Sequence, residues 1–542
     1  MIFSRIEMLK KSASAATYNI ILQLFLRMIT FVLNMVMIRH TSKEMLGIVN
    51  IRLMLLQSTI FFLATEPFDM AALSKVEKKN WKQVVNLMWF TIPIAAFFST
   101  MLGWVWLNVF EIPDEKVIPY YYFGVVCYAV SPCIATLARP LYIVAQSFFY
   151  VRLRVVSVAA TEVFKCIFIL SLVLYKPHLG LITFAVGQVL SEFVYVGIYY
   201  VYFYLHINDD DNPPHESFAF QSASDFFPQT IADKPLVHER TAKLTFSFFK
   251  QSILKQMLTE GEKYVMTVFG VLNFADQGVF GIINNLGALI PRFVFQPIEE
   301  SGRLFFSQVL HRGQTFLQQS RDEAYLAYQV LKHLLRGVYL IGCVILVFGN
   351  CYAYLLLDLY GGKTLSQGLG PLLLQWYCVY VLIIAINGIM ECFHFALMNH
   401  EETERYNKKM LLFSLVFLGS SLFLTSIFGA VGFILANCLT MCTRIFFSLL
   451  FIRQYYKGTD LRPLKSLIPS IPLVSSLAVS YVVMKLSEWK FCCGLGFAFR
   501  LVHIGIGSIC FIAVLGVLYL TEKELIWFIT KHYNVPRTTK KE

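Results

Sequence analysis

Charged residues are scarce in this sequence, and their scarcity argues against a soluble fold. Asp, Glu, Lys and Arg together make up 15% of the 542 residues, and 57% of the residues are hydrophobic. A soluble protein typically has about 25% charged residues, and a soluble fold of this length could not hide so much apolar surface from water. The composition therefore predicts an integral membrane protein, whose solvent is the bilayer.

The sequence also lacks the short motifs that carry common enzyme chemistry. It contains no His-Glu-x-x-His, Gly-x-Ser-x-Gly or P-loop pattern, and none of its 12 cysteines forms a Cys-x-x-Cys pair. The run Asp209-Asp210-Asp211 resembles a sugar-nucleotide metal motif only superficially, because such a run in a polar segment is usually solvated charge. We therefore expect no enzyme activity, no cofactor and no metal site.

The net charge of +12 does not indicate nucleic-acid binding. In a membrane protein, excess Lys and Arg usually face the cytosol. With the N-terminus placed there, most loop Lys and Arg fall on the cytosolic side, and an even number of helices makes both termini cytosolic. The cytosolic cations include Lys75, Lys78, Lys79, Lys82, Arg405, Lys408, Lys409, Arg453, Lys457, Arg462 and Lys465. Cys492 and Cys493 fall near a predicted lumenal turn, where oxidation is open to them, but adjacent cysteines rarely bridge each other, so we do not expect a disulfide between them.

Apolar runs long enough to cross a bilayer, which takes about 20 helical residues, follow one another along the chain. They predict an all-α fold of about fourteen transmembrane helices. The expected spans are 13–38, 46–68, 84–107, 119–145, 153–175, 179–206, 246–271, 277–300, 333–357, 370–396, 410–427, 430–452, 466–485 and 498–520.

The longest polar gap divides these helices into two groups. Residues 207–244 are rich in Asp, Ser and Pro, which is typical of a linker. At the C-terminus, Thr521 and Glu524 form a capping signal before an apolar face, which predicts a short interfacial helix. We expect an N-terminal six-helix lobe (1–206), a cytosolic linker (207–244), a C-terminal six-helix lobe (245–455), two further transmembrane helices (456–520) and a cytosolic tail (521–542).

The two lobes share a spaced pattern of polar residues. Gly47-Ile48-Val49-Asn50 recurs as Gly281-Ile282-Ile283-Asn284. The first helix has Gln23, Arg27, Thr30 and Asn34, and the seventh has Gln256, Glu260, Lys263 and Thr267; the second has Arg52, Thr59 and Glu66, and the eighth has Asn285, Arg292 and Glu299. These spacings put each set on one helix face, and the sets correspond at one offset of about 233 residues. The pattern predicts two pseudo-symmetric six-helix bundles, related by an axis along the membrane normal, plus two C-terminal helices.

These polar stripes place charges at membrane depth, where charges usually face a bundle interior or a watery cavity. Converging Arg and Lys side chains suit a diphosphate, so we predict a cationic cavity between the lobes. Pro291 and Pro297 favour bending of the eighth helix, which suits alternating access. The candidate substrate-binding residues are Arg27, Asn34, Arg39, Arg52, Glu66, Glu260, Lys263, Asn285, Arg292 and Glu299.

A structural interpretation of these charges is also open. They could pair as Arg–Glu bridges that lock the lobes together, and those near helix ends (Arg39, Arg52 and Glu66) could snorkel to headgroups. Glu391 and His394 lie one turn apart, as a polar pair or as a proton-coupling site. Three isolated basic residues in other helices suit a headgroup or packing role; they are Lys165, Arg444 and Arg500.

Several stretches spread over most of the chain carry a family resemblance. They are Ser42-Lys43-Glu44, Gly47-Ile48-Val49-Asn50-Ile51-Arg52-Leu53, residues 258–267, Asn284-Asn285-Leu286-Gly287, residues 296–301, Tyr360-Gly361-Gly362, Ala385-Ile386-Asn387-Gly388 and residues 431–438. In these stretches the sequence resembles the Rft family of eukaryotic endoplasmic-reticulum proteins, which is linked to movement of the dolichol-linked oligosaccharide.

The resemblance implies a fold and a function. The fold would be that of the multidrug/oligosaccharidyl-lipid/polysaccharide exporter superfamily. The function would be to move the pentamannosyl chitobiosyl diphosphodolichol from the cytosolic to the lumenal leaflet of the endoplasmic reticulum for N-linked glycosylation. Residues in matching motif positions are Arg27, Arg39, Glu260, Lys263, Arg292 and Glu299.

The partners implied are this lipid-linked oligosaccharide and the membrane lipids, with dolichol-pathway glycosyltransferases as further candidates. The main alternative is a non-transporting accessory protein of dolichol-linked oligosaccharide assembly. A membrane glycosyltransferase and a cation-coupled drug exporter, with Glu192 or Glu391 as the coupling residue, are the remaining rivals.

Overall fold

The regular structure of the described residues is helical throughout. A computed structural model describes residues 28–74, 80–148, 150–208, 218, 220–231, 235–493 and 496–533. In these ranges eleven helices are long and apolar enough to cross a membrane, and a further pair bent by 47° makes up to twelve spans. The predicted all-α membrane fold is confirmed.

Each of these helices, and the bent pair, covers one of the spans expected from the sequence. The expected span 13–38 lies mainly outside the described residues, and its described end is the helix Met28–Arg39. The expected single helix over 246–271 is instead two helices, α10 (Glu239–Thr259) and α11 (Gly261–Phe269). They separate because Glu260 leaves the helical conformation, with φ −105° and ψ 19°.

The chain folds into two compact units, Met1–Gly278 and Val279–Glu542. In the first unit, α2, η1 and α3 run on as one span. The remaining helices of this unit follow in order along the chain. The bounds are α2 (Lys43–Gly47), η1 (Ile48–Leu53), α3 (Met54–Leu73), α4 (Trp81–Trp89), α5 (Thr91–Asn108), α6 (Tyr121–Thr136), α7 (Arg139–Ser147), α8 (Val151–Tyr175), η2 (Pro177–Leu179), α9 (Leu181–Ile207), η3 (Ala223–Phe226), α10, α11 and α12 (Phe274–Gly287), which continues past the boundary.

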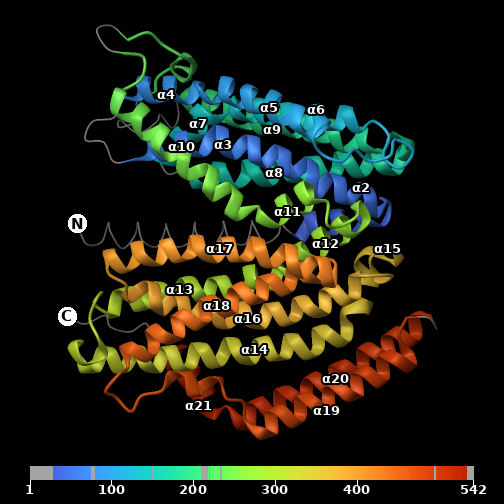
Figure 1. Ribbon diagram of the computed structural model, residues 1–542, viewed down its shortest axis with the longest axis vertical. Coiled ribbons are helices and arrows are strands. Elements are labelled where there is room, and N and C mark those ends of the chain that lie inside the picture. Colours follow the sequence, from blue (N-terminus) through green and yellow to red (C-terminus); the bar gives the residue numbers. More distant parts are fainter. Residues whose placement is uncertain are drawn as a thin grey trace. The chain divides into compact units, whose positions relative to one another are not determined.

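The centre of the first unit is α3, which packs against α5, α6 and α10 (Figure 1). Its apolar core joins η1 and α3 to α6 and α9 through residues such as Leu53, Leu56, Val125 and Phe184. Since α10 follows the polar gap in sequence yet packs on α3, the first unit includes a helix from beyond the linker. The lobe boundaries expected from the sequence stay a prediction.

The polar gap contains an ordered segment. Four phenylalanines, Phe218, Phe220, Phe226 and Phe227, lie on the ends of α4 and α9, and the first three are buried. The Asn86 side chain of α4 donates to Gln229 O (2.8 Å) and Leu236 O (3.1 Å) and accepts from Gln229 N (2.9 Å). We call residues 220–231 and 235–237 the docked segment.

A short capped turn begins this segment. Ser222 caps η3, and the Asp225 carboxylate accepts hydrogen bonds from the backbone N–H groups of Gln221 and Ser222 (both 3.0 Å). Partial burial of Asp225 opposes its ionisation, but these hydrogen bonds outweigh it and lower the pKa of the carboxyl.

The second unit is arranged around α16. This helix packs against α13, α14 and α18, and α17 packs against α18 (Figure 1). Asn399 begins α17 with a capping box, accepting from Glu402 N (2.8 Å) and donating its own N–H to Glu402 (2.9 Å). The bounds are η4 (Pro291–Phe295), α13 (Gln296–Val309), η5 (Phe316–Gln318), α14 (Arg321–Gly361), α15 (Lys363–Ser366), α16 (Gly370–Leu397), α17 (His400–Phe428), α18 (Val431–Tyr455), η6 (Pro463–Leu467), α19 (Ile471–Phe491), α20 (Phe497–Thr521) and α21 (Lys523–Tyr533).

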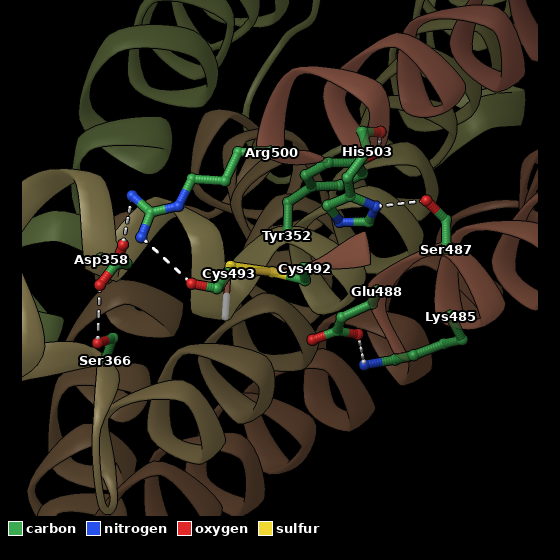
Figure 2. Close-up of a disulfide and its surroundings, with 10 residues drawn as sticks. All are labelled: Tyr352, Asp358, Ser366, Lys485, Ser487, Glu488, Cys492, Cys493, Arg500 and His503. Atoms are coloured by element: carbon green, nitrogen blue, oxygen red, sulfur yellow. Dashed lines mark hydrogen bonds and ion pairs between the residues drawn. A yellow bond between two sulfur atoms is a disulfide. The ribbon is translucent and has the colours of Figure 1, made fainter. Parts of the chain in front are cut away.

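The last two spans, α19 and α20, pack on each other and on α14. Near their turn, Arg500 of α20 pairs with Asp358 of α14 (2.9 Å), and Tyr352 stacks on His503 with ring centroids 4.4 Å apart (Figure 2). Cys492 and Cys493, which we did not expect to bridge each other because they are adjacent, form a disulfide in this turn (Figure 2).

The tail helix α21 begins at Lys523, later than the predicted cap at Thr521, because α20 continues through Thr521. The predicted N3 residue, Glu524, bonds instead to Lys332 of α14 (2.9 Å). This hydrogen bond and the charge of Lys332 hold the pKa of Glu524 below its usual range.

Candidate functional site

The stripes of the second and seventh predicted helices face each other inside the first unit. Thr59 of α3 shares a hydrogen bond with the Tyr264 hydroxyl (2.6 Å) and accepts a longer one from Gln256 (3.4 Å). Two turns along α3, Glu66 pairs with Lys255 of α10 (2.5 Å). We call these five residues the α3–α10 seam. Spacing predicted the faces of both helices, but Lys255 and Tyr264 were missed because they lie beside the predicted stripe.

Glu260 and Lys263 lie at the break between α10 and α11. Their side chains pair with each other (2.7 Å) and are 20% and 31% exposed. A cation that is partly exposed and neutralised by a neighbour one turn away remains able to exchange that neighbour for an anionic ligand. Lys263 is therefore open to an anionic ligand from solvent.

Arg52 lies in a different environment, with only 1% of its side chain exposed. It sits in the π-helical segment η1, whose wider turn changes the direction of side chains. Its guanidinium donates to the backbone carbonyl of Glu111 and lies 4.6 Å from the centre of the Phe274 ring. The Glu111 carboxylate is 3.7 Å away and 69% exposed. These contacts hold the loop after α5 against η1.

Two other predicted residues of the first unit lie on its first described helix. Asn34 is half-buried and accepts a long hydrogen bond from the Cys166 thiol (3.7 Å), and Arg39 is exposed near the end of that helix. Arg27 lies outside the described residues.

A buried ion pair in the first unit was not anticipated. Asp69 of α3 pairs with Arg139, the first residue of α7, and both are largely buried. The guanidinium also lies 4.2 Å from the centre of the Tyr142 ring. The sequence signal was an Asp in the apolar run of α3, but its partner is 70 positions away and no periodicity links them.

In the second unit, Arg292 is exposed and lies in η4, the second π-helical segment of the described chain. Asn285 is exposed on α12. Glu299 of α13 is half-buried against α16, where Gly388 leaves space for its carboxylate because a Cβ there would overlap it. Arg292 of η4 and Glu299 of α13 lie about two turns apart along the chain.

A second buried network joins α16, α17 and α18. Arg444 forms a bidentate pair with Glu391 (2.7 and 2.5 Å), which also accepts from Tyr406 (2.7 Å) and Asn387 (3.1 Å). His394 instead bonds to Ser448 (3.2 Å). The expected Glu391–His394 pair is therefore absent: Glu391 pairs with Arg444, and His394 bonds to Ser448.

The other two basic residues that looked isolated in sequence also have partners. Lys165 pairs with Glu162 (2.8 Å), and Arg500 pairs with Asp358. Most charges at membrane depth in the described chain are therefore neutralised locally. Of the three stripe cations that the structure describes, Lys263 and Arg292 are more exposed than Arg52, and such groups can bind phosphate oxygens by charge-assisted hydrogen bonds.

Comparison with solved structures shows the fold. The chain is similar to the lipid II flippase MurJ, with a TM-score of 0.60 and 13% identity over 94% of this chain and 100% of that one. It is also similar to an inward-facing multidrug resistance transporter of the MATE family in the MOP superfamily, with a TM-score of 0.52 and 11% identity over 80% of this chain and 96% of that one. The architecture expected from the sequence is confirmed.

Comparison with curated proteins identifies the family. A relative from Xenopus tropicalis is 44% identical over 97% of both chains, and one from Mus musculus is 43% identical over 96% of this chain and 97% of its own. A Drosophila melanogaster relative is 34% identical over 96% and 97%. Each is named Man(5)GlcNAc(2)-PP-dolichol translocation protein RFT1. The family model described as Rft protein matches residues 11–532, and this chain therefore belongs to the Rft family.

Proposed function

We propose that this protein translocates Man(5)GlcNAc(2)-PP-dolichol from the cytosolic to the lumenal leaflet of the endoplasmic-reticulum membrane, for N-linked glycosylation. The observation that carries the proposal is the 44% identity, over 97% of both chains, with a relative named for this translocation. Because the likeness spans nearly all of both chains, it includes the membrane helices and is more than a shared module.

The proposed path follows from how such a lipid divides between phases. Its polyprenyl tail stays in the hydrocarbon, where each buried CH₂ contributes about 0.8 kcal/mol. Only the diphosphate and sugars need a polar path. In our proposal this path lies between the N-terminal lobe (1–206) and the C-terminal lobe (245–455), which alternate in access, and is lined by the polar stripes.

Within this proposal the stripe residues differ in role. Arg292 and Lys263 bind the diphosphate: Arg292 is exposed in the π-helical segment η4, and Lys263 can exchange Glu260 for a phosphate. Arg27, Arg39, Asn34, Asn285 and Glu299 are assigned to the same path on their stripe or motif positions. Arg52 and Glu66 support the path through packing: Arg52 holds the loop after α5 against η1, and Glu66 joins α3 to α10 through Lys255.

The proposed orientation has both termini in the cytosol. The excess of Lys and Arg in the loops of that side supports it. The Cys492–Cys493 disulfide in the turn between α19 and α20 also supports it, because disulfides persist in an oxidising lumen. Glycosyltransferases of the dolichol pathway are candidate partners.

Reconstitution tests the proposed activity. Purified protein is placed in vesicles containing a fluorescent Man(5)GlcNAc(2)-PP-dolichol analogue, and transfer is followed by protection of the glycan from an added mannosidase. We expect faster transfer than in empty vesicles, and about tenfold slower transfer in R292Q and in K263Q. Removing one charged hydrogen bond to phosphate costs about 1.5–3 kcal/mol, and about 1.4 kcal/mol is tenfold in rate.

Matched controls are R405Q and K243Q, which remove exposed cations of α17 and α10 that our proposal leaves off the path. Transfer no faster than in empty vesicles would refute direct translocation. Saturable lipid binding without transfer would instead support the accessory role.

A further inference from the structure

A second basic site lies in the loop that joins α18 to α19, within the second unit. A cavity of about 430 Å³ opens between the end of α18 and the short helix η6. Three cations line it: Arg453 from α18, Arg462 from the loop, and Lys465 from η6. A cavity of this volume falls within the range of small-ligand pockets, about 300–1,000 Å³.

Among the described residues, no neighbour neutralises the charges of this cavity. No carboxylate of the described residues lines it, and Asp460 of the same loop is absent from its wall. Within the described ranges, Arg453, Arg462 and Lys465 take part in none of the ion pairs, whereas Arg336, Arg444 and Arg500 of the same unit are all paired. Three unpaired cations around one hollow favour an anion there.

One residue of the cavity wall, Tyr456, has a buried hydroxyl without a partner among the described residues. Tyr456 is 5% exposed, and its ring packs on Phe316 with centroids 5.5 Å apart. Its hydroxyl accepts or donates no hydrogen bond among the described residues. Leaving a buried hydroxyl unsatisfied is unfavourable, and an anionic oxygen within its reach would accept a hydrogen bond from it.

The backbone around the cavity is held in place from outside. Arg336 of α14 donates to Ser466 O (2.9 Å) and Ile468 O (2.7 Å) and pairs with Glu522. On the other side, the Thr459 hydroxyl donates to Tyr456 O (2.8 Å). A loop fixed before the ligand arrives loses less conformational entropy on binding.

We propose that this cavity binds the phosphate-bearing headgroup of an anionic phospholipid. The two Arg forks can bind phosphate oxygens bidentately, and Lys465 adds a point charge. Basic pockets between transmembrane helices at the membrane surface are suited to such headgroups.

A lipid fits better than a soluble phosphate because apolar surface continues from the cavity toward the membrane. Ile468 in its wall is 68% exposed, and Ile471 at the start of α19 is 84% exposed, so both can lie against acyl chains. This headgroup site goes beyond the proposed translocation, and binding at it is measurable without any transport.

Native mass spectrometry of the full chain in dodecyl maltoside tests the site, with phosphatidylinositol 4-phosphate as the probe and phosphatidylcholine as the neutral comparison. We expect saturable binding of the anionic lipid only, at least tenfold weaker in R453Q/R462Q/K465Q and about two- to fivefold weaker in Y456F. The charge-matched control R405Q/K408Q/K457Q removes three cations outside the cavity and should change affinity less than twofold.

Soluble probes distinguish the two sources of phosphate. We expect inositol 1,4-bisphosphate to displace the lipid only at concentrations at least tenfold higher, and inorganic phosphate to displace it more weakly still. Equal affinity for the soluble headgroup would overturn the lipid assignment. The site itself is refuted if the triple variant and its control weaken binding equally, or if neither does while both keep the wild-type Tm.

Discussion

Buried arginines in this protein are held by backbone oxygens and aromatic rings as well as by carboxylates. Arg52 bonds to a loop carbonyl and lies over Phe274, and Arg139 lies over Tyr142 beside Asp69. A guanidinium suits such places because it is planar, weakly hydrated and stacks on ring faces. These residues therefore stabilise helix contacts whether or not a ligand is bound.

We expect removal of the Arg52 side chain to lower stability much more than removal of the Glu111 side chain. We expect R52A to lower the free energy of unfolding by about 3 kcal/mol, because truncation empties a packed site and removes a hydrogen bond that the backbone of Glu111 accepts. E111A should cost under about 1 kcal/mol, since an exposed carboxylate contributes little and the backbone carbonyl remains.

Thermal unfolding in detergent, followed with a thiol-reactive dye that reports exposure of buried cysteines such as Cys166 and Cys378, measures both variants. Equal losses of Tm would show that the carboxylate, rather than the carbonyl and the packing, holds Arg52.

Sequence predicted the faces of the polar residues but not their partners. The spacing of Thr59 and Glu66 identified one face of α3 correctly as polar, because a helix repeats every 3.6 residues. Nothing in that spacing says which helix lies opposite, so the pairs with Lys255 and, in the second unit, Glu391 with Arg444 appeared only in three dimensions. Pairing across helices depends on tertiary packing.

At the scale of elements, the sequence predicted where the membrane-spanning helices lie, but it did not predict that part of the polar gap packs on α4 and α9. Apolar length alone located the membrane helices, since the bilayer thickness sets their minimum. The gap resembled a linker because of its Asp and Pro residues, yet its four phenylalanines were the signal that part of it packs. Clustered aromatics in a polar segment bury a large apolar area and so favour docking.

The docked segment depends on Asn86. We expect N86A to release the docked segment from α4, because three hydrogen bonds to backbone groups are lost and the facing carbonyls are left unsatisfied. Limited chymotrypsin digestion should then cut after Phe226 at least fivefold faster than in the wild type, whereas Pro228 blocks cleavage after Phe227.

N108A is the matched control, since the Asn108 side chain is exposed and bonds only within its own helix. Unchanged digestion of N86A would show that the phenylalanines alone hold the segment.

At the scale of the whole molecule, the boundary between the units does not coincide with the polar gap. The gap ends before α10, whereas the first unit ends at Gly278, inside α12. Sequence symmetry gives α10 to the second half of the chain, but its packing on α3 gives it to the first unit. The sequence repeat and the compact units therefore divide the chain at different positions, because the units depend on which helices pack together.

Because α10 follows the polar gap but packs on α3, we expect a chain cut within the gap to remain associated. Residues 1–212 and 213–542, co-expressed as two pieces with a tag on one, should copurify because α10 of the second piece packs on α3 of the first. In T59V/E66Q/K255Q, which removes the polar contacts of the α3–α10 seam, recovery of the untagged piece should fall at least threefold.

A divided chain carrying K250Q, an exposed lysine of α10 away from the seam, should copurify like the wild type. Separation of the two wild-type pieces in detergent would show that the seam is too weak to join them.

The length of α14 has a mechanical consequence. At 1.5 Å per residue its 41 residues extend about 60 Å, roughly twice the hydrocarbon thickness of about 30 Å. One end holds Asp358 against α20, and the other half carries Arg336, which fixes the loop around the headgroup cavity. An uninterrupted helix transmits tilt along its axis, so α14 would act as a lever through which a lipid bound at one surface biases the α19–α20 turn at the other.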